Sequence, residues 1–111
     1  MMTSTRFLIA LALPLALGAT ATRAADVNAG AEKAKQICAA CHGIDGNSQV
    51  PDFPRLAGQH PDYLAKALRD YQTGARKNPI MIGMSKPLSK ADIENVSAYY
   101  AQQPARLSAR E

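Results

Sequence analysis

The feature that most constrains this chain is the run Cys38-Ala39-Ala40-Cys41-His42, which contains both of its cysteines. On a helix, positions three and four residues apart share one face, so two thiols and the following imidazole would point to the same side. This C-x-x-C-H spacing is typical of a c-type haem site, in which the cysteines form thioethers with the porphyrin and the histidine binds the iron. The sequence therefore predicts one haem c, attached through Cys38 and Cys41, with His42 as an iron ligand.

Three other sites use closely spaced cysteines, and each leaves part of this pattern without a role. A thioredoxin-like redox pair normally follows a strand, and the sequence before Cys38 has no convincing strand pattern. A zinc centre needs four ligands, whereas the sequence has no third cysteine and only one further histidine, His60. A disulfide between Cys38 and Cys41 would close a very short loop of little entropic value. None of these alternatives uses the histidine that directly follows Cys41.

The N-terminal segment 1–24 has the pattern of a secretory signal peptide. Arg6 precedes an apolar run over residues 7–18, and small residues then lead to Ala24. The apolar run is well short of the roughly 20 residues that a membrane-spanning helix needs. We expect cleavage near Ala24–Ala25, with an uncleaved membrane anchor as the alternative. The mature chain would then be periplasmic and would have no stable membrane span.

The charge of the chain argues against nucleic acid as a partner. The net charge of +4 includes Arg6 and Arg23, which lie in the predicted signal peptide. The remaining 11 Lys and Arg face 9 Asp and Glu, a net charge of +2 that two haem propionates would cancel. Basic residues also do not cluster with aromatic ones, as they do in nucleic-acid-binding proteins. A nearly neutral protein should show only a modest dependence of partner binding on salt.

The small size of the mature chain suggests a fold that is built around its cofactor. Below about 80 residues a hydrophobic core rarely suffices without a staple, and this domain lies just above that limit, with no tryptophan. A buried porphyrin would supply the missing apolar bulk. We assign the domain to residues 25–104 and expect residues 105–111, which follow Pro104, to form a flexible tail.

The pattern of caps and apolar positions predicts an all-α fold with three main helices and ordered loops. The predicted helices cover residues 26–40, 61–73 and 90–102, and the predicted loops cover residues 43–60 and 75–88. Asp26 and Asn28 are candidate caps of the first helix, and Gly74 is a good stop for the second. Ser89 and Asp92 resemble a capping box at the start of the third.

Four segments together resemble a known family. They are residues 26–30 (DVNAG), 38–43 (CAACHG), 45–48 (DGNS) and 54–59 (PRLAGQ). This pattern resembles class I cytochromes c, in particular the cytochrome c553 group and one half of the dihaem cytochrome c4 type. The resemblance covers roughly residues 27–102 and implies a small cytochrome c fold around one haem. Because the sequence holds a single haem motif, we do not expect a full dihaem cytochrome.

The resemblance also implies a second axial ligand, a methionine before the last helix. Met81 stands where the family places this ligand, seven residues before Leu88, and Met84 is the alternative. A thioether favours Fe(II) over Fe(III), so His/Met ligation raises the reduction potential. His60 could instead complete a bis-His site, although we expect it to be a surface residue before Pro61.

Further positions carry over from the family as supports of the haem and its ligands. The backbone carbonyl of Pro54 would accept a hydrogen bond from the ring of His42, and Leu56 would pack on the same haem face. Gly30 and Tyr100 would lie near the crossing of the first and last helices, where a glycine lets an aromatic ring approach.

The resemblance implies an electron carrier without enzymatic activity, in which the iron cycles between Fe(II) and Fe(III) by outer-sphere transfer. Its partners would be redox proteins, such as a dehydrogenase, a cytochrome bc1-type complex or a terminal oxidase or reductase, and the carrier itself would be a monomer. The main alternative is a haem-bearing subunit permanently bound to a periplasmic dehydrogenase or oxidase. A gas-binding or catalytic haem protein and a haem-free thiol oxidoreductase are two further alternatives.

Partner docking would take place where the haem edge emerges, near residues 39–40 and 82–83. Several nearby positions stay open between a role at the haem and ordinary exposure to solvent. They are Arg76 and Asn78, for a propionate or the methionine loop, and Lys77, Lys86 and Lys90, for a positive rim.

Overall fold

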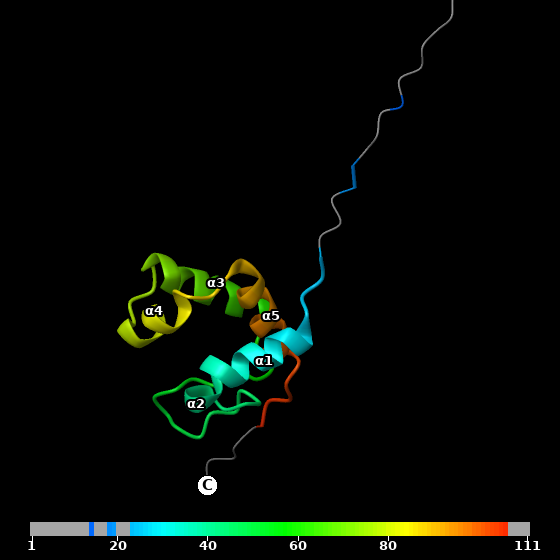
Figure 1. The fold of residues 1–111 in the computed structure, drawn as a ribbon. Helices are drawn as coiled ribbons and strands as arrows, with labels where there is room; N and C mark the ends of the chain where they lie inside the picture. Colours follow the sequence, from blue (N-terminus) through cyan, green and yellow to red (C-terminus); the bar gives the residue numbers. More distant parts are fainter. Residues whose placement is uncertain (1–13, 15–17, 20–22, 107–111) are drawn as a thin grey trace, which may run out of the picture.

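The computed structural model describes residues 14, 18–19 and 23–106, and within these residues the fold is all-α without strands. The helices are α1 (Val27–Ile37), α2 (Ala39–His42), α3 (Pro61–Thr73), α4 (Pro79–Ser85) and α5 (Lys90–Ala101). Helix α1 packs across α5, and α3 contacts both α5 and α4 (Figure 1). The predicted all-α class is confirmed.

The first predicted helix, over residues 26–40, is divided at Cys38. Asp26 is the N-cap of α1, because its side chain accepts a hydrogen bond from Ala29 N at 3.0 Å. Cys38 ends α1 by donating its backbone N–H to Ala34 O at 2.8 Å, and it is also the N-cap of α2. The haem motif therefore occupies a helical turn of its own rather than the last turn of a longer helix.

The two other predicted helices are confirmed. Helix α3 begins at Pro61 and stops at Gly74, whose φ of 78° is left-handed and suits a residue without a side chain. Helix α5 begins with the full capping box of Ser89 and Asp92, in which each side chain bonds the other's backbone N–H.

The prediction of an irregular segment over residues 75–88 is wrong, because this segment contains α4. Asn78 is its N-cap, and the Asn78 side chain accepts from the backbone N–H groups of Ile80 and Met81, each at 3.1 Å. Pro79 occupies the first helical position, where its missing N–H costs nothing. The candidate iron ligand Met81 is therefore placed on a capped helix.

Close packing of α1 against α5 depends on Gly30. A Cβ atom at this position would lie 2.0 Å from the backbone oxygen of Asn95 and 3.0 Å from Cβ of Tyr99. The aromatic side chain with an atom nearest to Gly30 is Tyr99. Tyr100 shares a buried core cluster with Ala34 of α1, and an added Cβ at Gly46 would come within 2.7 Å of its ring.

Most of the predicted signal peptide 1–24, and residues 107–111 of the predicted flexible tail, lie outside the described residues. Arg106, which the prediction also placed in this tail, is held by a hydrogen bond from its backbone N–H to the Asn47 side chain at 2.7 Å. In the described part of the chain, no helix combines the length and the hydropathy needed to cross a bilayer.

Candidate haem site

One cavity of about 660 Å³ lies between α2 with the loop that follows it and the α3–α4 pair, and its walls are largely apolar. This volume falls in the range of roughly 300–1,000 Å³ that is usual for ligand and cofactor sites. Its lining includes all six sequence-predicted site residues: Cys38, Cys41, His42, Pro54, Leu56 and Met81. Residues up to 43 positions apart in sequence therefore meet at one site.

The ring of His42 is held in one orientation. It is 6 % exposed, and its Nδ1 lies 2.7 Å from the backbone oxygen of Pro54. A carbonyl oxygen only accepts, so Nδ1 carries the proton and donates it, which leaves the lone pair on Nε2 free for a metal. The Phe53 ring, which the sequence did not single out, lies 6.4 Å from the His42 ring, centroid to centroid.

The two cysteines line the cavity as free thiols. Burial raises the pKa of the Cys38 thiol to about 11, although the neighbouring Tyr100 hydroxyl lowers it in part. Reactive redox cysteines have thiol pKa values below the usual range, so Cys38 does not have the character of a thiol oxidoreductase. Among the described residues, no group of three or more His, Cys, Asp or Glu side chains could hold a metal ion.

The side of the cavity that carries Met81 and Met84 belongs to α4, and α3 holds this helix in place. Gln72 donates from Nε2 to the backbone oxygens of Ser85 and Leu88, both at 2.8 Å, so it anchors the end of α4. The fully buried Ser85 hydroxyl donates to the backbone oxygen of Met81 at 2.7 Å. The role of Gln72 was missed, because a glutamine near the end of a helix carries no signal of its distant partners.

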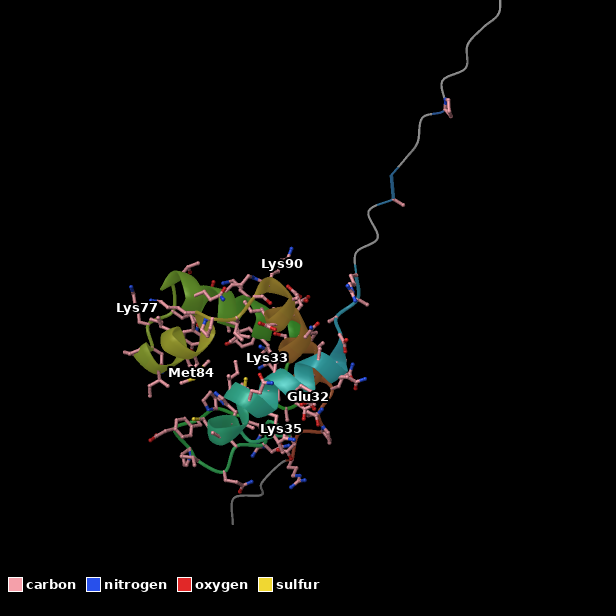
Figure 2. The ribbon with its side chains drawn as sticks, viewed as in Figure 1. Glu32, Lys33, Lys35, Lys77, Met84 and Lys90 are labelled. Carbon is pink, nitrogen blue, oxygen red and sulfur yellow. The ribbon has the colours of Figure 1, made fainter. Side chains whose placement is uncertain are left out.

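Both methionines line the cavity, but they differ in exposure. Met81 is half-buried, whereas the Met84 side chain is 49 % exposed. In Figure 2, Met84 lies at the edge of α4 that is nearer to α2. Met81 is thus the methionine that the fold shields better from water.

The comparisons with known proteins agree with this arrangement. Residues 27–103 match the family model of cytochrome c. The chain belongs to the cytochrome c family. Cytochrome c4 of Thiocapsa roseopersicina is 46% identical over 86 residues, which are 78% of this chain and 44% of the relative. Cytochrome c-554(548) of Halomonas halodenitrificans is 40% identical over 83 residues, which cover 72% of this chain and 99% of that relative.

A solved structure shows the same fold. The crystal structure of reduced recombinant cytochrome c4 from Pseudomonas stutzeri matches with a TM-score of 0.70 and 43% sequence identity. The match covers 76% of this chain and 48% of that one, so this cytochrome c spans about half the length of the cytochrome c4 relatives. The family resemblance seen in the sequence is confirmed.

The residues on the cavity walls fit a haem c. Two free thiols stand three residues apart beside an imidazole whose outer nitrogen is free, and the remaining lining is mainly aliphatic and aromatic. The buried Ser97 hydroxyl lines the same cavity and has no hydrogen-bond partner among the described residues. Buried polar atoms without partners are rare in a complete site. This cytochrome c carries one haem, bound covalently through Cys38 and Cys41.

The contacts in the structure distinguish the residues whose roles the sequence left open. Asn78 holds the methionine helix, as its cap shows. Arg76 lines the cavity with its guanidinium 4.9 Å from the Tyr71 ring centre and 3.4 Å from the Tyr63 hydroxyl. Lys77 and Lys90 stand well apart on the surface (Figure 2), so these two do not form one positive rim.

Proposed function

We propose that this cytochrome c is an electron carrier that exchanges single electrons with other redox proteins. One observation carries the proposal: an oriented imidazole on α2 and a shielded thioether on α4 line the same cavity. His42 and Met81 would be the two side chains that hold the haem iron. An iron held by both side chains would offer no open position to a substrate, so outer-sphere transfer is the chemistry that this pair of residues would favour.

Each part of the chain has a separate task in this proposal. The bound haem supplies a reversible Fe(II)/Fe(III) couple. Pro54 keeps the Nδ1 proton of His42 in place and so raises the basicity of the ring. As an iron ligand, the Met81 thioether would raise the reduction potential, because a soft, neutral ligand favours the ferrous state. The apolar lining around Leu56 keeps water from both ligands.

We also propose that the carrier works in the periplasm after removal of residues 1–24, with residues 25–104 as its domain. The basic start, the short apolar run and the small residues before Ala25 support export. Its partner would be a redox protein that docks transiently, over less than about 1,200 Å². The near-neutral charge of the mature chain predicts a weak salt dependence of this encounter.

The test is a visible spectrum of the holoprotein, made in cells with haem-maturation machinery, in both oxidation states and with carbon monoxide. We expect low-spin bands, the weak far-red band of methionine-bound ferric haem and no response to carbon monoxide. The Met81→Ala protein should lose the far-red band and bind carbon monoxide. The Met84→Ala protein is the matched control and should behave as the wild type.

Two outcomes would contradict the proposal. A high-spin wild-type protein that binds carbon monoxide would make a gas-binding or catalytic role the better explanation. Loss of the far-red band in Met84→Ala but not in Met81→Ala would reverse the assignment of the sixth ligand.

A further inference from the structure

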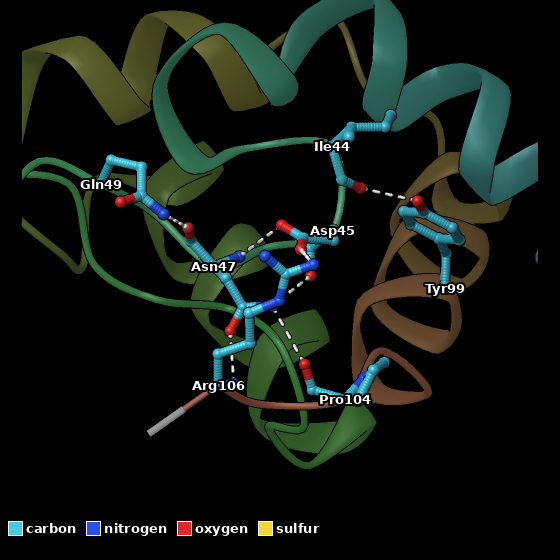
Figure 3. A network of polar contacts seen from close by, with 7 residues as sticks. All are labelled: Ile44, Asp45, Asn47, Gln49, Tyr99, Pro104 and Arg106. Carbon is cyan, nitrogen blue, oxygen red and sulfur yellow. Dashed lines mark hydrogen bonds and ion pairs between the residues drawn. The ribbon is translucent and has the colours of Figure 1, made fainter. Parts of the chain in front are cut away.

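A short C-terminal segment, residues 104–106, lies against the loop that follows α2, and we call it the strap. Asn47 binds the strap through both ends of its side-chain amide (Figure 3). Its Nδ2 donates to the Pro104 backbone oxygen at 3.0 Å, and its Oδ1 accepts from the Arg106 backbone N–H at 2.7 Å. Asn47 is 4 % exposed, so these bonds are shielded from water.

The contacts of Asn47 are with the backbone of the strap rather than with its side chains. An amide that bonds the carbonyl of one residue and the N–H of the second residue after it imitates a neighbouring strand. The Arg106 side chain adds only an exposed ion pair to Asp45, with nitrogen and oxygen 3.5 Å apart. Exposed ion pairs contribute little to stability. The buried amide of Asn47 is therefore the main link between the strap and the first part of the loop, which contains Asp45 and Asn47. We call this part the first limb and the part that contains Pro54 and Arg55 the second limb.

The strap also contacts the second limb of the same loop, at Arg55. The Arg55 guanidinium donates to the Arg106 backbone oxygen. The two limbs are joined directly as well, because the Gly46 backbone oxygen accepts from Leu56 N at 2.8 Å and from Ala57 N at 3.1 Å. The loop is thus closed on itself next to Asn47, and the strap crosses it on the outside.

The loop carries one atom that matters for the haem site. Pro54, which precedes Arg55, provides the carbonyl that accepts the Nδ1 proton of His42. The hydrogen bond to His42 uses the backbone oxygen of Pro54, so the Pro54 side chain does not set the position of the acceptor. The position of this acceptor therefore depends on the contacts that hold the second limb, residues 54–55, in place.

We propose that Asn47 is a positioning residue for His42: by binding the strap, it holds the loop in the conformation that presents the Pro54 carbonyl to the ring. This role rests on the proposed function, in which His42 is an axial ligand. It explains why a buried asparagine lies five residues beyond His42, with partners 57 and 59 residues further along the chain.

The test follows the His42 Nδ1 proton of the reduced holoprotein by solution NMR after transfer to heavy water. In Asn47→Ala we expect this proton to exchange about tenfold to a hundredfold faster, the factor expected when a local opening loses two hydrogen bonds. The reduction potential should rise, because a weaker bond from Nδ1 makes the imidazole a poorer donor to Fe(III). A purely structural role would leave the potential unchanged.

Two variants serve as matched controls. Arg106→Ala removes the ion pair but keeps the backbone that Asn47 binds, so its exchange rate should stay within about twofold of the wild type. Ile93→Val weakens the core at a site away from the loop and lowers global stability by a comparable amount. It should leave the His42 proton protected, because that proton exchanges through local opening.

A shortened chain that ends at Gln103 provides a second route if Asn47→Ala does not fold. It lacks the strap, so it should reproduce the fast exchange, and adding Asn47→Ala to it should change nothing further. Unchanged exchange and potential in Asn47→Ala, or equal acceleration in Ile93→Val, would overturn the role of Asn47. The wild-type spectrum decides the ligand assignment separately, so the two proposals fail in distinguishable ways.

Discussion

The substitution Gly30→Ala tests the packing that supports the haem motif. Gly30 lies where α1 crosses α5, and the added methyl carbon would be 2.0 Å from the Asn95 oxygen and 2.5 Å from its carbonyl carbon. Ordinary contacts between carbon and oxygen are about 3.3 Å or longer. The obstacle is backbone and cannot rotate away, so the two helices would have to separate by more than about 1 Å.

The cost of this change follows from the geometry. Overpacking a well-packed site costs about 1–3 kcal/mol, and a backbone obstacle places this case at the upper end, about 3 kcal/mol. In a domain of this size, 1 kcal/mol shifts the Tm by about 4–8 °C. We therefore expect Tm to fall by at least about 12 °C in Gly30→Ala, measured on the holoprotein by circular dichroism and by haem absorbance.

Two other glycines provide controls with the same chemical change. An added Cβ at Gly83 would meet no atom within 4 Å, so Gly83→Ala in α4 should be neutral or stabilising by up to about 1 kcal/mol. Gly74 is equally open, but its φ is +78°, so alanine there should cost about 1–2 kcal/mol from backbone strain alone. A Tm of Gly30→Ala equal to that of Gly74→Ala or higher would refute the reasoning from close packing.

Two further predictions concern the methionine helix and the last helix. In Gln72→Leu the end of α4 loses both of its amide donors, so the far-red methionine band should disappear at a lower urea concentration than in the wild type, whereas an unchanged midpoint would contradict an anchoring role. The Ser89 backbone N–H holds the pKa of the Asp92 carboxyl below its usual value. A carboxyl with a lowered pKa stabilises the fold above its unfolded pKa of about 3.9, and this contribution is lost as pH falls through the folded value. The wild type should therefore exceed Asp92→Ala by about 0.5–1 kcal/mol near pH 7, and urea unfolding should show the difference vanishing towards pH 3.

The sequence predicted best the elements whose signals are local. Pro61, which fits the first helical position, and Gly74 mark the bounds of α3, and Ser89 with Asp92 marks the start of α5. Gly74, Ser89 and Asp92 each bond backbone three residues away. The seven residues of α4 are too few to show an apolar period, and two methionines beside a glycine do not suggest a helix. The cap signal of Asn78 followed by Pro79 was present and could have revealed it.

In the candidate site, too, some contacts could be predicted from the sequence and others could not. The family pattern carried Pro54 to the acceptor position of His42, and the structure contains that hydrogen bond. The contacts of Gln72 and Asn47 could not be predicted, because their partners are backbone atoms distant in sequence, and any residue offers the same backbone. The contact of Tyr99 with Gly30 was missed, since a single step along a helix turns a side chain by about 100° and the sequence alone does not fix which of two adjacent tyrosines faces the glycine.

The loop after α2 is closed by bonds that leave out its exposed tip. The Gly46 backbone oxygen accepts from Leu56 N and Ala57 N across the loop, whereas Gln49 and Val50 are exposed. Lengthening a flexible loop costs little, about 0.6 kcal/mol for each doubling. The protein thus has a place, next to Gln49, where its surface can diverge or accept an inserted peptide tag while the bonds that close the loop are kept.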